Sequence, residues 1–463
     1  MVLHRFDDEP RGQIDPVSEI IPIFSLGIPD ARPIFLHEIA KSDFHGWNDT
    51  PKPSVSIAFH EAVGKAAAVQ RRDLTFKWLE HLSEVDREVW DALALRLETP
   101  FLEWDWLQLM EESGSTDPEA GWIPRHLTVW SGRELLAAAP LYVKTHSAGE
   151  FVFDHAWADV AGRLNRPYYP KLVGMSPFTP MIGYRFLMAP GQDEAELTAR
   201  MLQEIERFCR NYGLSGSSFH FADPQWAETF AGRGFCPWAH QSFVWENEGF
   251  TGFEDYLSRF NANQRRNIRR ERRRLAERGV RVDMISGDDL PGELYERMHL
   301  FYSRTNDQFG PWGCKYLTRS FFSLLPERFR QRLVFAVATD GTRRGPPVGM
   351  ALLVTKGENL YGRYWGCARD VEFLHFESCY YRPIEWAVAS GIRRFDPGMG
   401  GGHKLRRGFK AVPNFSLHRF MDPVLRQIME KHISAINRLE QEEIAALNRH
   451  LPLRNLIESG AGK

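Results

Sequence analysis

The chain has 463 residues and a formal net charge of −2, with 43% hydrophobic and 25% charged residues. This length exceeds the size at which one hydrophobic core keeps growing, so it predicts two domains with extensions. The nearly neutral balance excludes a global attraction to nucleic acid or to a membrane surface. We therefore expect no DNA partner, and only local sites for anions.

The five cysteines are scattered and lack C-x-x-C spacing, which argues against a disulfide framework and against a metal site. No apolar run approaches the ~20 residues of a membrane span. Asp7, Asp8 and Glu9 stand where a secretory signal would be apolar. These observations predict a cytoplasmic protein with no membrane span.

The first half of the chain begins with an extension over residues 1–75, which carries a helix candidate near 58–69. Apolar residues then recur at helical spacing over 74–93, which predicts an amphipathic helix. Strand patterns at 126–130 and 135–144 flank a short polar turn and predict a hairpin. The elements expected next are an aromatic stretch at 151–157, a strand at 184–188, a helix at 194–211, a strand at 217–221, a helix at 225–233 and a strand at 241–246.

The second half repeats this order. Its expected elements are a helix at 294–305, strands at 333–339, 348–355 and 360–365, a helix at 377–390, a strand at 393–396, a glycine-rich loop and a strand at 415–420. A meander followed by a helix and a strand is the order of a GNAT-like fold, so its repetition predicts an α/β (α+β) protein with two tandem GNAT-like domains. Each domain would be a mixed, mostly antiparallel sheet flanked by helices.

The predicted organisation has four parts: an extension at 1–75, two domains at 76–250 and 251–422, and a tail at 423–463. Apolar residues stripe a long polar helix in this tail. We interpret that helix as a packing element or as the contact of a homodimer.

The glycine-rich loop follows the strand at 393–396 and leads into a run of cations. Glycines let backbone N–H groups approach an anion closely, and the cations neutralise it. The residues expected to bind a pyrophosphate, or the phosphodiester of an RNA end, are Gly398, Gly400, Gly401, Gly402 and Arg407. The alternative is a mobile loop with solvated charges.

A second segment, 374–381, could supply the base that acyl transfer to an amine requires, because an amine with a pKa near ~10 must lose a proton to attack. His375 and Glu377 are candidates for that base, and Tyr380 or Tyr381 could return a proton to the leaving group. The alternative is that Glu377 caps a helix and that the tyrosines pack in the core.

A third segment, 264–279, predicts a helix with eight arginines and two glutamates, and with one apolar stripe through Ile268 and Leu275. So many arginines on one helix of a neutral protein form a local electropositive patch. Arg269 and Arg270 are therefore candidates for binding phosphates, with a solvated charged face as the alternative.

Motifs of other enzyme classes do not occur in the sequence. It contains no Walker loop, no H-E-x-x-H, no G-x-S-x-G and no dinucleotide-binding fingerprint after a strand. Hydrolase, kinase and dehydrogenase functions therefore have no support.

Several short sequence segments resemble those of the FemAB-like family of predicted N-acyltransferases, and they occur in the family's order between about residues 100 and 422. In the first half they are 121–127, 149–154, 168–172 and 177–180. In the second half they are 268–272, 361–366, 374–377, 379–381, 403–404 and 407–409. The resemblance implies a tandem acyl-CoA N-acyltransferase fold with no tightly bound cofactor.

The resemblance also extends to the Fem transferases, which take amino acids from aminoacyl-tRNA and add them to peptidoglycan precursors. In those relatives a stretch similar to 405–409 contributes a cation at the acyl centre, which implies that role for Arg406. Family members carry a glutamate before the His-Lys pair, where this chain has Gly402. If that glutamate is the base in relatives, this protein uses another group or has lost the activity.

Together these features predict an N-acyltransferase that moves an acyl group from a thioester such as acyl-CoA to a small-molecule or peptide amine. We expect His403 or Glu377 to deprotonate the amine, and Lys404 and Arg406 to stabilise the oxyanion. Arg363 would hold phosphate. Two alternatives stay open: an aminoacyl-tRNA-dependent transferase, which the arginine-rich helix favours, and a non-catalytic binding protein, which Gly402 favours.

Overall fold

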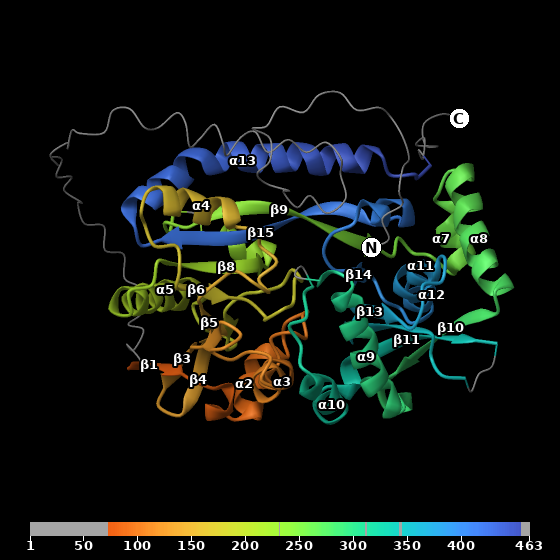
Figure 1. Ribbon diagram of the computed structural model, residues 1–463. Coiled ribbons are helices and arrows are strands. Elements are labelled where there is room, and N and C mark those ends of the chain that lie inside the picture. Colours follow the sequence, from red (N-terminus) through yellow and green to blue (C-terminus); the bar gives the residue numbers. More distant parts are fainter. Residues whose placement is uncertain (1–72, 231, 311–312, 342–344, 455–463) are drawn as a thin grey trace, which may run out of the picture. The chain divides into compact units, whose positions relative to one another are not determined.

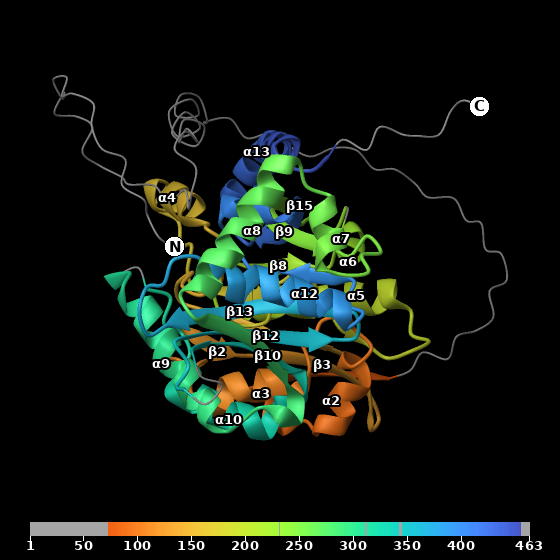
Figure 2. The same ribbon diagram turned by 90° about the vertical axis from the view of Figure 1, so that its right-hand side faces the viewer.

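The computed structural model describes residues 73–230, 232–310, 313–341 and 345–454, all within one compact unit. The helix expected near 58–69 lies outside the described residues. The described residues form a four-stranded and an eleven-stranded sheet, with helices on both sides (Figures 1 and 2). This mixed, mostly antiparallel arrangement, built twice along the chain, confirms the expected α/β fold class with two GNAT-like halves.

The small sheet has the order β1-β3-β4-β7, with β1 (Leu74–Leu79), β3 (His126–Ser131), β4 (Glu134–Ala139) and β7 (Leu187–Met188). The large sheet has the order β10-β11-β12-β13-β14-β9-β15-β8-β6-β5-β2. Its strands are β10 (Val280–Ser286), β11 (Leu333–Asp340), β12 (Gly349–Lys356), β13 (Asn359–Cys367), β14 (Arg394–Asp396), β9 (Cys236–Glu246), β15 (Lys410–Phe420), β8 (Gly216–Ala222), β6 (Lys171–Gly174), β5 (Leu141–Lys144) and β2 (Trp122–Pro124).

The helices differ in length and in how they begin. Those that precede or belong to the first half are α2 (Arg87–Ala94), α3 (Trp104–Glu112), α4 (His155–Arg163), α5 (Glu194–Asn211) and α6 (Pro224–Glu228). Later ones are α7 (Phe253–Ser258), α8 (Ala262–Glu277), α9 (Glu293–Asp307), α10 (Arg319–Arg328), α11 (Leu374–Phe376), α12 (Arg382–Ala389) and α13 (Pro423–Arg449). A π-helical turn (Glu377–Tyr381) joins α11 to α12, and a 3₁₀ turn, η6 (Gly402–Arg407), precedes β15.

The two halves exchange their closing strands. β15, the last strand of the chain, pairs antiparallel with β8 of the first half and with β9. β9, the last strand of the first half, pairs in turn with β14 of the second half. The exchange makes one continuous sheet, along which α13 lies over β9 and β15 (Figure 1). The domain limits at residues 250 and 422 stay a prediction.

The helix expected over 74–93 is wrong in its first part. Leu74, Phe76 and Trp78 alternate with Thr75 and Lys77, and this period of two places them in strand β1, which pairs with β3. The helical spacing through Trp78 is incidental there, and α2 begins only at residue 87. A short apolar segment satisfies both periods, and pairing with β3 decides between them.

Several other expected elements have different limits. The strand expected at 135–144 is broken at Pro140, and its parts β4 and β5 join different sheets. The strand expected at 184–188 shortens to two residues, and the helix at 225–233 ends at Glu228. The closing strands are longer than expected, because β9 starts at Cys236 and β15 at Lys410.

Because β15 lies between strands of both halves, we expect its core residues to stabilise both halves at once. Leu417 is fully buried opposite Phe219 and Pro237. Leu417→Ala should lower the free energy of unfolding by about 2–5 kcal/mol in a single transition, measured by urea titration with fluorescence and circular dichroism. The control Leu439→Ala, at a side chain 45% exposed, should change it by less than about 0.5 kcal/mol. Two separate transitions, of which Leu417→Ala shifts only one, would contradict the exchange.

Candidate active site

The glycine-rich loop lies where two parallel strands part. β13 and β14 pair in parallel only as far as Tyr361 and Asp396, after which β13 continues to Cys367. The chain leaves β14 and passes close to β13, so that a Cβ on Gly398 would lie 3.3 Å from the carbonyl oxygen of Gly362. Ligands of open α/β sheets bind at such carboxyl ends of strands.

Lys404 is held inside this loop. Its ammonium donates to the carbonyl oxygens of Gly398 (2.6 Å) and Met399 (2.9 Å), and its side chain is buried. Burial lowers the pKa of Lys404 to about 7, although the nearby carboxylate of Asp396 opposes the shift. Asp396 is itself buried and accepts from the backbone N–H of Gly398 (2.9 Å), and burial raises its pKa to about 6.

His403 faces Tyr380. The Tyr380 hydroxyl oxygen lies 2.9 Å from Nε2 of His403, and the ring of His375 stands 5.4 Å from Tyr380 and 5.7 Å from His403. Burial, followed by the charges of Lys404 and Arg407, lowers the pKa of His403 to about 3. Burial also lowers the pKa of His375 well below its usual value. Both imidazoles are therefore neutral at physiological pH, and neither is a strong base.

Glu377 is not part of this cluster. On the π-helical turn its carboxylate accepts from Nε (3.1 Å) and Nη2 (2.9 Å) of Arg272 on α8, and Arg272 also bonds Glu385 (2.8 Å). Burial raises the pKa of Glu377, and Arg272 opposes this. The sequence offered a helix cap as the alternative role. The structure instead places an ion pair there, with a partner more than a hundred residues away.

The two neighbouring arginines of η6 point in different directions. Arg407 is buried: it donates to the carbonyl oxygen of His403 (2.8 Å) and to Glu271 (3.1 Å), and it stacks 3.4 Å from the centroid of the Phe376 ring. Tyr381 donates to the same carboxylate of Glu271. Arg406 has an exposed side chain, and its carbonyl oxygen accepts a hydrogen bond from Gln264 (2.7 Å). Arg407 is thus bound within the protein, while Arg406 faces solvent.

The remaining candidates for phosphate binding are dispersed. Arg363 donates to the carbonyl oxygen of Phe178 and to the Tyr364 hydroxyl (3.0 Å), so it joins the two halves. Arg269 pairs with Glu254. Arg270 is exposed and forms no ion pair within the described part of the chain. The glycines Gly400 and Gly401 have positive φ values of 71° and 87°, which non-glycine residues rarely adopt, while Gly402 does not.

A buried charge cluster in the first half was not among the predicted sites. The ammonium of Lys171 donates to Glu150 (2.8 Å), Asp154 (2.5 Å) and Ser147 (3.0 Å), and Nε2 of His220 lies 3.1 Å from Glu150. All of these residues except His220 lie within or beside the segments 149–154 and 168–172, which resemble the family but carry no chemical motif that would reveal a charge cluster. The cluster fixes the 147–154 loop against β6.

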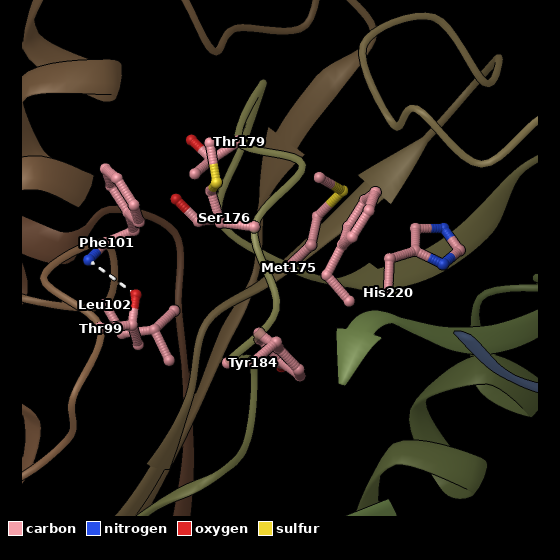
Figure 3. Close-up of a pocket in the computed structure, with 11 residues that line it drawn as sticks. Thr99, Phe101, Leu102, Met175, Ser176, Thr179, Tyr184 and His220 are labelled. Atoms are coloured by element: carbon pink, nitrogen blue, oxygen red, sulfur yellow. Dashed lines mark hydrogen bonds between the residues drawn. The ribbon is translucent and has the colours of Figure 1, made fainter. Parts of the chain in front are cut away.

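A small pocket lies at the other parallel pair of the large sheet, where β6 and β8 part (Figure 3). Its lining residues are Thr99, Phe101, Leu102, Met175, Ser176, Thr179, Met181, Gly183, Tyr184, His220 and Phe221. Sequence reasoning did not find this pocket, because its walls come from three separate segments.

Residues 81–455 match a family described as FemAB-like, peptidoglycan biosynthesis/recognition. The chain belongs to the FemAB-like family. It is therefore a transferase of acyl or aminoacyl groups, which confirms the class expected from the sequence. No curated protein sequence matches the chain. Within the described residues, no helix of this FemAB-like protein has the length and apolar character needed to span a bilayer.

Solved structures resemble the FemAB-like chain at low sequence identity. The crystal structure of FemX is 11% identical and covers 75% of this chain and 98% of its own, with a TM-score of 0.47. The C-terminal domain of a putative lysylphosphatidylglycerol synthetase from Agrobacterium fabrum is 12% identical, with coverage of 77% and 98% and a TM-score of 0.46. A tandem GNAT protein from the clavulanic acid pathway is 13% identical, with coverage of 76% and 99% and a TM-score of 0.39.

The different surroundings of Arg406 and Arg407 predict different effects of the same substitution. Arg407→Met removes a buried guanidinium and leaves the half-buried carboxylate of Glu271 without its cation, so it should lower the free energy of unfolding by about 1–3 kcal/mol. Arg406→Met removes an exposed side chain and should change it by less than about 0.5 kcal/mol. Urea unfolding at pH 7 measures both values. Equal effects would mean that Arg407 does not hold the turn together.

Proposed function

We propose that this protein is an N-acyltransferase that moves an acyl group from a thioester such as acyl-CoA to the amine of a small molecule or peptide. The observation that carries the proposal is Lys404, a buried lysine with a pKa of about 7 at the end of β14, beside the Tyr380–His403 pair. A group with a pKa near the working pH is suited to accept a proton from an ammonium.

In this proposal the neutral form of Lys404 is the base. His403 is too weakly basic for that task, with a pKa of about 3, and Glu377 is neutralised by Arg272. The acceptor ammonium gives a proton to Lys404 and its nitrogen attacks the carbonyl carbon of the thioester. The C–S bond then breaks, and the thiolate takes the second proton released by the nitrogen. Relatives carry a glutamate at the position of Gly402. If that glutamate is their base, its absence here means that Lys404 takes this role.

Tyr380 and His403 stabilise the oxyanion. Burial raises the pKa of Tyr380, so its hydroxyl stays protonated, and in this proposal it donates to Nε2 of His403, 2.9 Å away. The imidazole then carries its own proton on Nδ1, from which it can donate to the oxyanion of the tetrahedral intermediate. The ring of His403 lies against Gly401, where a Cβ would collide with the imidazole, so the backbone of the loop borders the same place. Arg406 and Arg270, both exposed, are available for donor phosphates.

An aminoacyl-tRNA donor is the second candidate. The observation that favours it is the exposed side of α8, where Arg266 and Arg270 form no ion pair within the described residues. Four residues of an α-helix span 6 Å, so these arginines could each bind a phosphate of one strand. Either donor is a co-substrate rather than a bound cofactor. Both place the protein in the cytoplasm.

The pH dependence of turnover tests the role of Lys404. Deprotonation of the base requires a pH above its pKa, so kcat/KM should rise as the pH increases through about 7 and fall below it. Lys404→Met should lower kcat/KM by about 100-fold and abolish the rise near pH 7. The pH profile should then show only the rise at higher pH that comes from deprotonation of the acceptor amine. Thiol release from acetyl-CoA in the presence of mixed primary amines measures the rate.

Lys410→Met provides the matched control, because this lysine follows the same turn but pairs with Glu248 at the surface (3.1 Å). It should keep both the rate and the limb near pH 7. The proposal fails if Lys404→Met turns over with the wild-type profile. Binding of acetyl-CoA without any thiol release would favour the non-catalytic protein.

A further inference from the structure

The pocket between β6 and β8 is lined mainly by hydrocarbon, aromatic rings and two thioethers, together with the hydroxyl groups of Thr99, Ser176, Thr179 and Tyr184. Two of these hydroxyls donate within the protein, Thr179 to Pro177 (2.8 Å) and Tyr184 to Pro140 (2.9 Å). Ser176 accepts from Trp106 (3.0 Å) and Thr99 accepts from the backbone N–H of Phe101 (3.3 Å), so an occupant meets at most two hydroxyl donors and otherwise an apolar wall.

Among the described residues, the lining contains no carboxylate and no lysine or arginine. His220 belongs to it, but Figure 3 shows its ring turned away from Met175 and Tyr184. Its Nε2 lies 3.1 Å from Glu150, on the other side of the strand. A charged occupant would lose its hydration without gaining an ion pair, which weakens its binding. The pocket thus favours an uncharged group.

One methionine of the pocket lining also approaches the turn that holds Lys404. The Cε atom of Met181 lies 3.9 Å from the position that a Cβ on Gly398 would occupy, and the carbonyl oxygen of Gly398 accepts from Lys404 (2.6 Å). Arg363 adds a second link, because its guanidinium stacks 5.5 Å from the ring of Phe101 while its own strand borders the loop. The pocket and the proposed acyl centre therefore share a wall.

We propose that this pocket receives the end of the acyl chain, that the acyl group is short and uncharged, and that Met181 sets its length. This inference rests on the proposed function. The pocket has room for about one water molecule (about 10 Å³), which is close to one methyl group. Met181 and Met175 both line this small pocket, so a longer chain requires lining side chains to move. An aminoacyl group would place its ammonium where no acid is present.

Isothermal titration with acetyl-CoA, butyryl-CoA, hexanoyl-CoA and free CoA tests this assignment without knowledge of the acceptor. Wild-type protein should bind acetyl-CoA at least 10-fold more tightly than hexanoyl-CoA. Met181→Ala should improve binding of hexanoyl-CoA at least 10-fold, because it opens the wall beside Gly398. Met181→Leu keeps the volume and should retain the preference for the short chain.

Two matched comparisons isolate the cause. Met284→Ala truncates a half-buried methionine of β10 that does not line the pocket, and it should leave the chain-length order unchanged. β-Alanyl-CoA has the shape of butyryl-CoA with a terminal ammonium, and it should bind at least 10-fold more weakly than butyryl-CoA to wild-type protein.

The outcomes separate this inference from the function on which it rests. If all thioesters bind equally well to wild type and to Met181→Ala, acyl-CoA remains the donor, but the pocket does not select the length of the acyl chain. Tighter binding of hexanoyl-CoA than of acetyl-CoA to wild type also overturns the inference. If neither CoA nor any thioester binds, the inference and the acyl-CoA donor are both wrong.

Discussion

The exchange of closing strands is the constraint on which the candidate site depends. β15 can pair with both β8 and β9 only if the chain crosses from the second half into the first after η6. The turn is thus fixed at both ends, by β14 on one side and by β15 on the other. A segment held in this way keeps one geometry without a packed helix of its own. That rigidity is what an electrostatic catalyst requires, because dipoles must already point at the charge that develops.

The second constraint is the burial of charge within this frame. Lys404 is desolvated, and its recorded hydrogen bonds go to carbonyl oxygens rather than to a carboxylate. Asp396 is close enough to influence it but forms no ion pair with it among the described residues. A direct ion pair opposes the effect of burial, and Glu150 and Asp154 together raise the pKa of Lys171 above its usual value. The two lysines show how partner choice decides between a structural ammonium and a proton acceptor.

Sequence periodicity predicted the elements that are long or isolated. α5 and α13 follow from their apolar stripes, and the hairpin of β3 and β4 follows from alternation around a polar turn. Periodicity failed at β1, where six residues satisfy both periods. It also could not show that β9 and β15 change places, because strand order is set by pairing between segments distant in the chain.

The candidate site was predicted in part for the same reason. The sequence predicts that the loop with His403 and Lys404 follows a strand, and this strand is β14. It also names Tyr380 as a candidate, and the structure brings Tyr380 within 2.9 Å of His403. Glu377 and Arg407 could not be separated from them, because their partners Arg272 and Glu271 lie on α8, more than a hundred residues earlier. From the sequence alone, a charged residue that is paired through tertiary contacts cannot be distinguished from an unpaired one.

The most direct test of the central claim is a thermal-shift comparison of the purified protein with acetyl-CoA, free CoA and bulk aminoacyl-tRNA at low and at physiological salt. A ligand that binds only the folded state raises the melting temperature by mass action. The account predicts a clear rise with acetyl-CoA that salt changes little. A rise only with aminoacyl-tRNA, lost steeply as salt increases, would contradict it and favour aminoacyl-tRNA as the donor.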